Sequence, residues 1–426
     1  MDGQNFERIG KIMKKISSFS IKLFVASLAF NILLCFSSPI YAYSDSYTWS
    51  SPLNFSLETS SAISTNGTDD TSNPLNLDCG SCILIEQKTG QILYSYNSHE
   101  KLRPASVTKL MSIYLIMDAI SLGKISYDTK IPCSANAESM GGSQIWLTTT
   151  EELTVDEMLK AICIVSANDC VTAMAEYLGG TEENFVNMMN EKAKTLGMND
   201  TNFKNCHGID EDDHYTSSYD IALLSRALLN NYPEITKYTT IYMDTLRDGK
   251  SSLVNTNKLV RNYNGCTGLK TGSTSLALYN LSASATRDNM SLIAVVMKAP
   301  SSKVRFSNAS SLLDYGFTNF EYKELAKKNE PIKVDKGVLP TVEVIPENDC
   351  GTLIAKGNDI NIEQNIVISD NISAPISQGE IIGKLEFRLN GDIISETNLI
   401  AKDGIDKIGF FSMEKLIVGD WFELLR

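Results

Sequence analysis

The sequence predicts an α+β protein in which an antiparallel sheet covered by helices is followed by a small all-β domain. Two pairs of strand-like runs, 81–87 with 91–96 and 278–286 with 290–298, enclose a long stretch of helical sequence. After about residue 326 the helical signal fades, and short apolar runs alternate with Gly, Asn and Pro. These observations place a first domain at 78–325 and a second, β-rich domain at 326–400.

The elements of the first domain follow from local signals. Residues 88–90 and 287–289 carry turn residues between strand-like runs, which predicts two hairpins. Val107–Ile120 is long and strongly apolar, as expected of a helix buried in the middle of a domain.

A second pair of helices is predicted farther along the chain. Thr154 and Glu157 have the spacing of a capping box, which opens a helix that runs through Ile164. Another helix is expected over 169–178. Residues 166–168 are therefore expected in a short loop between two helices.

Length and charge limit the function. The 426 residues exceed one ordinary core, so two domains with terminal extensions are expected. With 38 Lys and Arg against 51 Asp and Glu, the net charge of −13 would repel phosphate backbones. Nucleic acid is therefore not an expected partner.

The first 42 residues are typical of an export signal. A short apolar run, Leu23–Phe36, precedes a cleavage site at Ile40–Ala42. The alternative is an uncleaved membrane anchor, but the run is shorter than the roughly 20 residues that span a bilayer. Processing as a lipoprotein at Cys35 would need a small residue where Leu34 stands. The cationic residues before the apolar run are Arg8, Lys11, Lys14 and Lys15.

An exported protein acts outside the cytoplasm, in the cell wall or on the outer face of the membrane. Residues 43–77 begin with a stretch rich in Ser, Thr, Asn and Asp and are expected to form a flexible linker. Eight of the nine cysteines remain after processing, and the sequence does not choose among their pairings. Cys79 and Cys82 form a C-x-x-C pattern without the partners of a zinc site, so no metal or other cofactor is expected.

The chemistry is indicated by Ser106 and Lys109. Acyl transfer by serine needs a nucleophile, a base within hydrogen-bond reach and donors for the developing oxyanion. At the start of the buried helix, Ser106 and Lys109 lie one turn apart on the same face. The helix N-terminus adds a positive dipole end. Burial or a neighbouring cation would lower the pKa of the lysine enough for it to act as a base.

The same short motifs occur elsewhere, and context separates them. Only Ser106 opens an apolar helix. Three motifs, Ser106-x-x-Lys109, Ser166-x-Asn168 and Lys270-Thr271-Gly272, follow one another at a helix start, between two helices and on a strand. Other copies, which we interpret as structural, include those that begin at Ser98, Ser121 and Ser412 for S-x-x-K, at Ser134 for S-x-N and at Lys88 for K-T-G.

With these motifs and several further blocks, the chain resembles the low-molecular-mass D-alanyl-D-alanine carboxypeptidases, which are penicillin-binding proteins with a β-lactamase-like catalytic domain. The resemblance covers about 78–325 and is weaker over the β domain. The further blocks are Pro104-Ala105-Ser106, Ser139–Ser143, His207-Gly208, His214-Tyr215-Thr216, Gly268–Gly272, Tyr279-Asn280-Leu281 and Ala285-Thr286.

The resemblance implies a role for each motif. Ser106 is the nucleophile and Lys109 its base. Ser166 relays a proton to the leaving amine, and Asn168 holds the substrate amide. The implied reaction removes the terminal D-alanine of peptidoglycan stem peptides in cell-wall biogenesis, and β-lactams would acylate Ser106 in place of the substrate.

The remaining roles concern the substrate carboxylate and the oxyanion. By the resemblance, Lys270, Thr271 and Gly272 line the substrate site, where the lysine supplies positive potential and the threonine a hydrogen bond. The backbone N–H groups of Ser106 and Ser273 form the oxyanion hole, although other members carry histidine in place of Ser273. Arg305 matches an arginine that binds the terminal carboxylate, a task suited to a bidentate guanidinium.

Other activities were weighed against this one. A class A β-lactamase would need a glutamate in an E-x-x-L-N stretch, which the chain lacks. A transpeptidase or D,D-endopeptidase would use the same acyl-enzyme and stays open. A zinc carboxypeptidase would need H-E-x-x-H or similar ligands, and a non-catalytic wall-binding protein would not need the three motifs to coincide. The three histidines of the chain are His99, His207 and His214.

The C-terminal tail, 401–426, is rich in apolar residues and suits a helix at a membrane surface. Gly419 and Asp420 interrupt the pattern, so docking on the β domain is the alternative.

Overall fold

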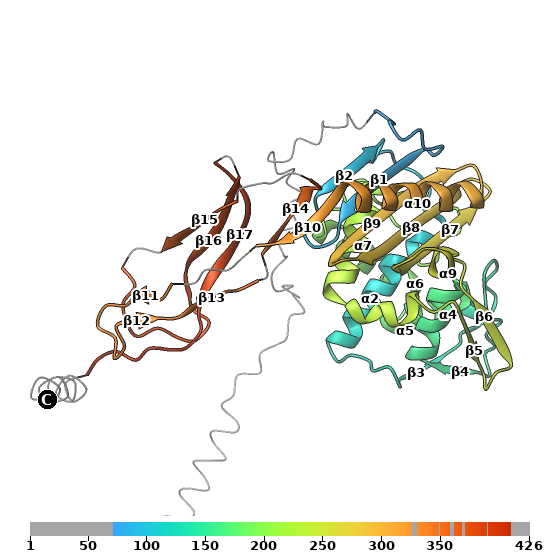
Figure 1. Cartoon of the computed structure of the whole chain (residues 1–426). Helices are drawn as coiled ribbons and strands as arrows, with labels where there is room; N and C mark the ends of the chain where they lie inside the picture. The colour runs from blue at the N-terminus through green and yellow to red at the C-terminus, as the bar shows by residue number, and fades with distance from the viewer. Residues whose placement is uncertain are drawn as a thin grey trace, which may run out of the picture. The chain divides into compact units, whose positions relative to one another are not determined.

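The computed structural model describes residues 71–325, 330–348, 350–357, 362–368, 371–389 and 391–409. The predicted export signal, most of the linker and the tail from residue 410 lie outside these residues. The fold class is confirmed: a mixed α and β domain precedes a part whose described elements are all strands (Figure 1).

The first domain is built on a five-stranded antiparallel sheet with the strand order β2-β1-β9-β8-β7. Both predicted hairpins are confirmed, and β1 pairs with β9, for example Ile83 with Val295, so the two hairpins join in one sheet. The strands are β1 Ser81–Glu86, β2 Ile92–Tyr96, β7 Cys266–Thr274, β8 Leu278–Arg287 and β9 Met290–Ala299.

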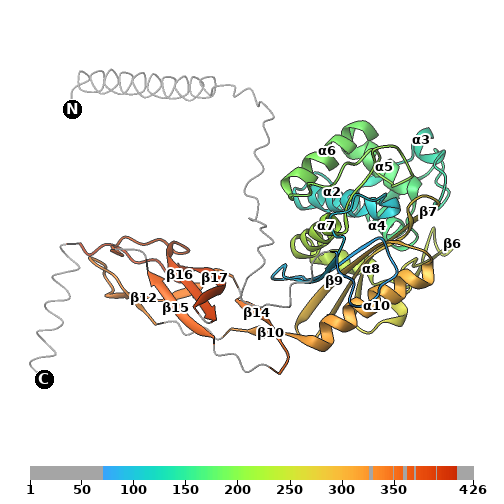
Figure 2. The same cartoon turned by 90° about the horizontal axis from the view of Figure 1, so that it is seen from above.

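Helices cover both faces of this sheet. Figure 2 shows α10 on one side and α2 and α7 on the other. The helices of the domain are η1 Ala105–Thr108, α2 Lys109–Ser121, α3 Ala135–Glu138, α4 Val155–Ile164, α5 Asn168–Gly179, α6 Glu182–Thr195, α7 Ser218–Asn231, η2 Pro233–Ile235, α8 Thr236–Thr239, α9 Leu259–Asn262 and α10 Ser302–Asn319. The domain also has two small two-stranded sheets, β3 Lys130–Pro132 with β4 Glu152–Thr154 and β5 Met243–Leu246 with β6 Ser251–Val254.

Strand β9 shows why both faces are covered. Its residues alternate between two hydrophobic cores, because successive side chains of a strand point to opposite faces. Ile293, Val295 and Met297 join the core that contains α2 and α7. Leu292, Ala294 and Val296 join the core under α10. Because both the odd-numbered and the even-numbered residues of β9 are apolar, both faces of the strand need a layer of helices to cover them.

Helix α2 is buried in the middle of the domain, as its apolar sequence predicted. Every residue from Lys109 to Met117 is buried. The first turn differs from the prediction in one respect, because Ala105–Thr108 forms a 3₁₀ turn that α2 continues.

The β domain has its own four-stranded antiparallel sheet, with the order β13-β17-β16-β15. Its core includes Val344, Leu385, Phe387 and Leu399. The strands after α10 are β10 Phe320–Glu324, β11 Ile332–Lys333, β12 Thr341–Val342, β13 Val344–Pro346, β14 Gly351–Ala355, β15 Glu363–Ile368, β16 Ile381–Leu389 and β17 Asp392–Ala401.

Three further observations concern the predicted linker, the cysteines and membrane spans. Residues 73–77 pack on the first domain: Leu77 is buried, and the Tyr94 hydroxyl donates to Asn73 Oδ1 at 2.8 Å. The eight cysteines of the described chain form no disulfide with one another. None of the described helices combines the length and apolar character needed to cross a bilayer.

The predicted capping box at the start of α4 is confirmed. Thr154 Oγ1 accepts from the Glu157 N–H at 3.3 Å, and Glu157 Oε2 accepts from the Thr154 N–H at 2.9 Å. The box sets where α4 starts. The helix then ends at Ile164, directly before the loop that carries Ser166.

We therefore expect Thr154→Ala to lower the free energy of unfolding by about 1 kcal/mol, because the Glu157 N–H of the first turn loses its acceptor. In a domain of this size that corresponds to a fall in melting temperature of roughly 2–4 °C. Thermal unfolding followed by circular dichroism would measure it. Thr148→Ala is the matched control, since Thr148 is exposed and caps no helix. Equal shifts in the two variants would contradict the assignment.

Candidate active site

The 3₁₀ turn at the start of α2 brings Ser106 and Lys109 together. Residues three apart are eclipsed in a 3₁₀ turn, whereas in an α-helix they share a face but are offset around the axis. Lys109 Nζ accordingly lies 3.0 Å from Ser106 Oγ. The turn begins at Ala105, whose φ of 49° is unusual for a residue other than glycine. The predicted pair of nucleophile and base is therefore within hydrogen-bond reach.

The Lys109 amine is fully buried and surrounded by oxygen atoms. It donates to Asn168 Oδ1 at 2.6 Å and to the His207 carbonyl at 2.5 Å, besides its contact with Ser106. Burial, followed by the nearby charge of Lys270, holds the pKa of Lys109 well below its usual value. A neutral amine has two hydrogens and one lone pair. With the hydrogens directed to Asn168 and His207, the lone pair faces the Ser106 hydroxyl.

Asn168 is fixed by the segment that precedes α4. Its Nδ2 donates to the Gly141 carbonyl and its backbone N–H to the Ser143 carbonyl, both at 2.7 Å. The next residue, Asp169, is buried and accepts the N–H groups of Ile145 and Leu147 at 3.0 Å each. The loop between α4 and α5 and the segment 141–147 thus form one hydrogen-bonded unit.

Ser166 lies in this loop with a left-handed backbone, at a φ of 66°. Its hydroxyl oxygen is buried and has no hydrogen-bond partner in the described chain. A buried hydroxyl without a partner is uncommon in a folded protein and is a feature that function can explain.

The K-T-G motif occupies the edge strand β7, as the sequence predicted. Lys270 is buried, and its Nζ donates to the Thr271 carbonyl at 3.0 Å. Burial is the main cause that lowers the pKa of Lys270 to about 7, and the charge of Arg305 adds to it. The Thr271 hydroxyl donates to Thr256 Oγ1 at 2.8 Å.

Gly272 allows β7 to approach the nucleophile. A Cβ at this position would lie 2.8 Å from the Pro104 carbonyl oxygen and 2.9 Å from the Ser106 nitrogen. The backbones are therefore in direct contact, which only glycine permits here. Strand β8 supports the same segment, since Asn280 Nδ2 donates to the carbonyls of Arg103 and Pro104 at 2.9 Å each.

Arg305 lies on α10 and supports the same strand. Its Nη1 donates to the carbonyls of Gly272 at 2.9 Å and Asn280 at 3.2 Å. Its guanidinium carbon lies 4.8 Å from the centre of the Phe306 ring. Arg305 Nε is buried and has no hydrogen-bond partner among the described residues.

A cavity of about 510 Å³ opens at the nucleophile. Of the residues that the sequence predicted, Ser106, Asn168 and Ser273 line it, and Ser273 is exposed. Lys109, Ser166, Lys270 and Thr271 are buried and do not line it, and neither does Arg305. The other lining residues are Gly142, Ser143, Gly208, Ile209, Asp210 and Thr274.

Sequence reasoning missed the contact between Lys109 and His207. The contact uses the backbone carbonyl of His207, which any residue could supply, so the side chain at this position gives no sign of it. The signal that could have found it is Gly208, whose φ is 90° and whose Cβ would lie 1.9 Å from the Ala105 carbonyl oxygen. Within the described residues, no group of three or more His, Cys, Asp or Glu could hold a metal ion.

Comparisons with known proteins agree with this geometry. A family model described as "D-alanyl-D-alanine carboxypeptidase" matches residues 68–301, and the model of the penicillin-binding protein 5 C-terminal domain matches 320–407. A D-alanyl-D-alanine carboxypeptidase of Bacillus subtilis, DacF, is 45% identical over 348 residues, which are 80% of this chain and 89% of the relative.

The structure of the chain is also similar to two solved structures. Penicillin-binding protein 5 of Haemophilus influenzae is 30% identical with a TM-score of 0.68, over 79% of this chain and 100% of that one. Penicillin-binding protein D2 of Listeria monocytogenes, solved in an ampicillin-bound form, is 28% identical with a TM-score of 0.53, over 57% of this chain and 100% of that one. With Ser106 and Asn168 lining one cavity and the buried Lys109 amine in contact with both, the chain belongs to the family of serine D-alanyl-D-alanine carboxypeptidases.

Proposed function

We propose that this chain is a serine D,D-carboxypeptidase that removes the terminal D-alanine from peptidoglycan stem pentapeptides through an acyl-enzyme on Ser106. The observation that carries the proposal is the buried amine of Lys109, which has a lowered pKa and lies 3.0 Å from the Ser106 hydroxyl. Such an amine is a base placed beside a nucleophile, in a cavity that can admit a peptide end.

The first half of the reaction forms the acyl-enzyme. Lys109 Nζ accepts the hydroxyl proton as Ser106 Oγ attacks the carbonyl carbon between the two terminal D-alanines. The N–H groups of Ser106 and Ser273 stabilise the resulting oxyanion. When the C–N bond breaks, the Ser166 hydroxyl passes a proton to the nitrogen of the departing D-alanine and regains one from Lys109. The buried Ser166 hydroxyl has no other partner among the described residues, which suits such a relay.

The second half returns the enzyme to its starting state. A water molecule attacks the ester carbon, its proton passes to Lys109, and the Ser106 oxygen leaves with that proton. The products are the shortened peptide and free Ser106. A β-lactam would enter the same sequence at the first step, with its ring nitrogen as the leaving group, and would remain attached where water attacks slowly.

Recognition of the terminal carboxylate is assigned to the K-T-G strand and to Arg305. Lys270 supplies positive potential, because a substrate carboxylate beside its amine would favour the protonated form. The Thr271 hydroxyl, now bonded to Thr256, can turn to the carboxylate. The unpartnered Nε of Arg305 leaves the guanidinium with a free donor toward an anion.

The location of the protein follows from its substrate. Peptidoglycan lies outside the cytoplasmic membrane, so the chain acts there, after export directed by residues 1–42. We place the catalytic domain at 78–325 and the β domain from 326. The predicted tail begins at 401, but residues 401–409 pack on the β domain, where Ile405 is buried, so the part that would associate with the membrane surface is 410–426.

We expect Ser106→Ala to abolish covalent labelling by a fluorescent penicillin, and peptide mapping of the wild type to place the label on Ser106. Lys109→Met should lower the rate of D-alanine release from a model pentapeptide on the order of a hundred to ten thousand fold, because the proton acceptor is lost. Ser98→Ala, in a second S-x-x-K motif, is the control and should behave as the wild type. Label on another serine would refute the site.

The lowered lysine pKa values predict a bell-shaped pH dependence of kcat/KM. The rate should rise as Lys109 loses its proton, with a midpoint well below the pKa of about 10.5 of a free lysine. It should fall again as Lys270, with a pKa of about 7, loses the charge that attracts the carboxylate. D-alanine release followed from about pH 5 to about pH 11 tests both limbs. An optimum near pH 10.5 would mean that neither amine is perturbed.

Arg305→Ala should lower kcat/KM for a peptide with a free C-terminal carboxylate by roughly ten- to a hundredfold, the value of a charge-assisted hydrogen bond. The same peptide with a C-terminal amide should lose far less, because the guanidinium has no anion to pair with. Equal losses for acid and amide would instead assign Arg305 to the support of β7.

A further inference from the structure

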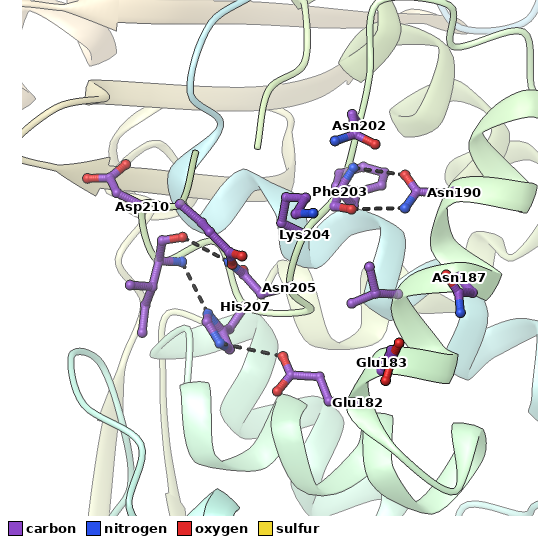
Figure 3. A pocket seen from close by; sticks show the side chains of 13 residues that line it. Glu182, Glu183, Asn187, Asn190, Asn202, Phe203, Lys204, Asn205, His207 and Asp210 are labelled. Atoms are coloured by element: carbon purple, nitrogen blue, oxygen red, sulfur yellow. Dashed lines mark hydrogen bonds and ion pairs between the residues drawn. The ribbon is translucent and has the colours of Figure 1, made fainter. Parts of the chain in front are cut away.

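The residues 205–211 form a wall between two cavities. On one side lies the cavity at Ser106. On the other lies a second cavity of about 610 Å³, shown in Figure 3. Ile209 and Asp210 line both cavities, while His207 lines the second. The wall therefore lies between the catalytic residues on one side and, on the other, side chains to which the mechanism above gives no role.

The backbone on the N-terminal side of this wall is held from two directions. The Cys206 carbonyl accepts from Ser112 Oγ at 2.6 Å, and Ser112 belongs to the same helix as Lys109. The Cys206 N–H donates to Glu182 Oε1 at 3.2 Å. Glu182 is the first residue of α6. The two peptide groups on either side of the Cys206 Cα, which directly precede the His207 carbonyl, are thus held by two helices: the first by Glu182 of α6 and the second by Ser112 of α2.

The His207 ring is oriented by the same glutamate. Its Nδ1 accepts from the Ile209 N–H at 3.1 Å, which leaves the ring hydrogen on Nε2. Nε2 lies 3.5 Å from Glu182 Oε1, and Figure 3 shows the two side chains pointing toward each other. Burial, followed by the charge of Lys109, lowers the pKa of His207 to about 3, so the ring is neutral at physiological pH. A neutral N–H therefore faces a carboxylate oxygen.

We propose that Glu182 is a positioning residue for the reaction: its carboxylate holds the Cys206 N–H and the His207 ring, and thereby holds the His207 carbonyl against the Lys109 amine. This inference rests on the proposed function. The His207 carbonyl is one of the two acceptors that direct the amine hydrogens. The other acceptor, Asn168, is anchored independently by Gly141 and Ser143. Without Glu182 the His207 carbonyl would lose its fixed position. The Lys109 amine would then rotate, and its lone pair would no longer point at the Ser106 hydroxyl.

Glu183 is the control that separates a positioning role of Glu182 from a purely structural role in helix α6. Glu182 and Glu183 both lie in the first turn of α6, where negative charge favours the helix. Both line the second cavity, but Glu183 is exposed and makes no contact with the wall in Figure 3. Replacing Glu183 removes the same charge from the same helix end and leaves the contacts to Cys206 and His207 intact.

The test compares Glu182→Ala, Glu182→Gln and Glu183→Ala in the full chain. D-alanine release gives kcat and KM, fluorescent penicillin gives the acylation rate, and thermal unfolding reports stability. Glu182→Ala should lower kcat and the acylation rate by roughly ten- to a hundredfold, the effect of a misplaced catalytic group, with KM changed less than about twofold. Glu182→Gln should recover most of the rate, because its amide oxygen can still accept the Cys206 N–H. Glu183→Ala should match the wild type.

The inference is overturned if Glu182→Ala keeps the wild-type kcat, or if Glu182→Gln is as slow as Glu182→Ala. Should Glu182→Ala not fold, Glu182→Asp replaces it: the shorter carboxylate should lower kcat and leave KM unchanged, and a wild-type kcat would refute the inference. Failure of the proposed function looks different, because the wild type itself would then release no D-alanine and Ser106 would take no label.

Discussion

The site depends on one buried amine. A charged ammonium in a protein interior is strongly disfavoured unless its hydrogens are bonded, and burial therefore shifts lysine toward its neutral form. Burial, followed by the nearby charge of Lys270, holds the pKa of Lys109 low, and the amine contacts three oxygen atoms, from Ser106, Asn168 and the His207 carbonyl. These atoms lie on three separate segments of the chain. With its two hydrogens directed to Asn168 and His207, the neutral amine presents its lone pair to the nucleophile.

The scaffold serves this contact by letting backbones approach each other closely. The residues at Gly272 and Gly208 both lie against the turn that carries Ser106, and a Cβ at either position would collide with backbone atoms of that turn. Strand β7 and the wall at 205–211 therefore contact the turn that carries Ser106 from two directions. Two buried or half-buried carboxylates hold the next layer of the site. Asp169 accepts the N–H groups of Ile145 and Leu147, and Glu182 accepts the N–H of Cys206.

Much of the fold and part of the site could be predicted because the signals are local. The capping box of Thr154 and Glu157, the two hairpins and the buried helix at 107–120 depend on neighbours within a few residues, and the structure shows each of them. The motifs at Ser106, Ser166 and Lys270 could be separated from their copies because each needs a particular element around it. The His207 carbonyl could not be predicted, since a backbone oxygen carries no sequence signal. The hydrogen bond from Thr271 to Thr256 could not be predicted either, because it depends on the loop after β6 packing against β7.

The amino-acid sequence by itself determined the elements, the order of the three motifs and the family that they resemble, because helix caps, strand alternation and turn residues act over short distances. Only the tertiary structure decided which groups surround the Lys109 amine, how far its pKa falls, and that Arg305 reaches the Gly272 carbonyl from α10. These outcomes depend on burial and on distances between segments far apart in the chain. Both quantities exist only after the sheet, its helices and the wall at 205–211 have packed together.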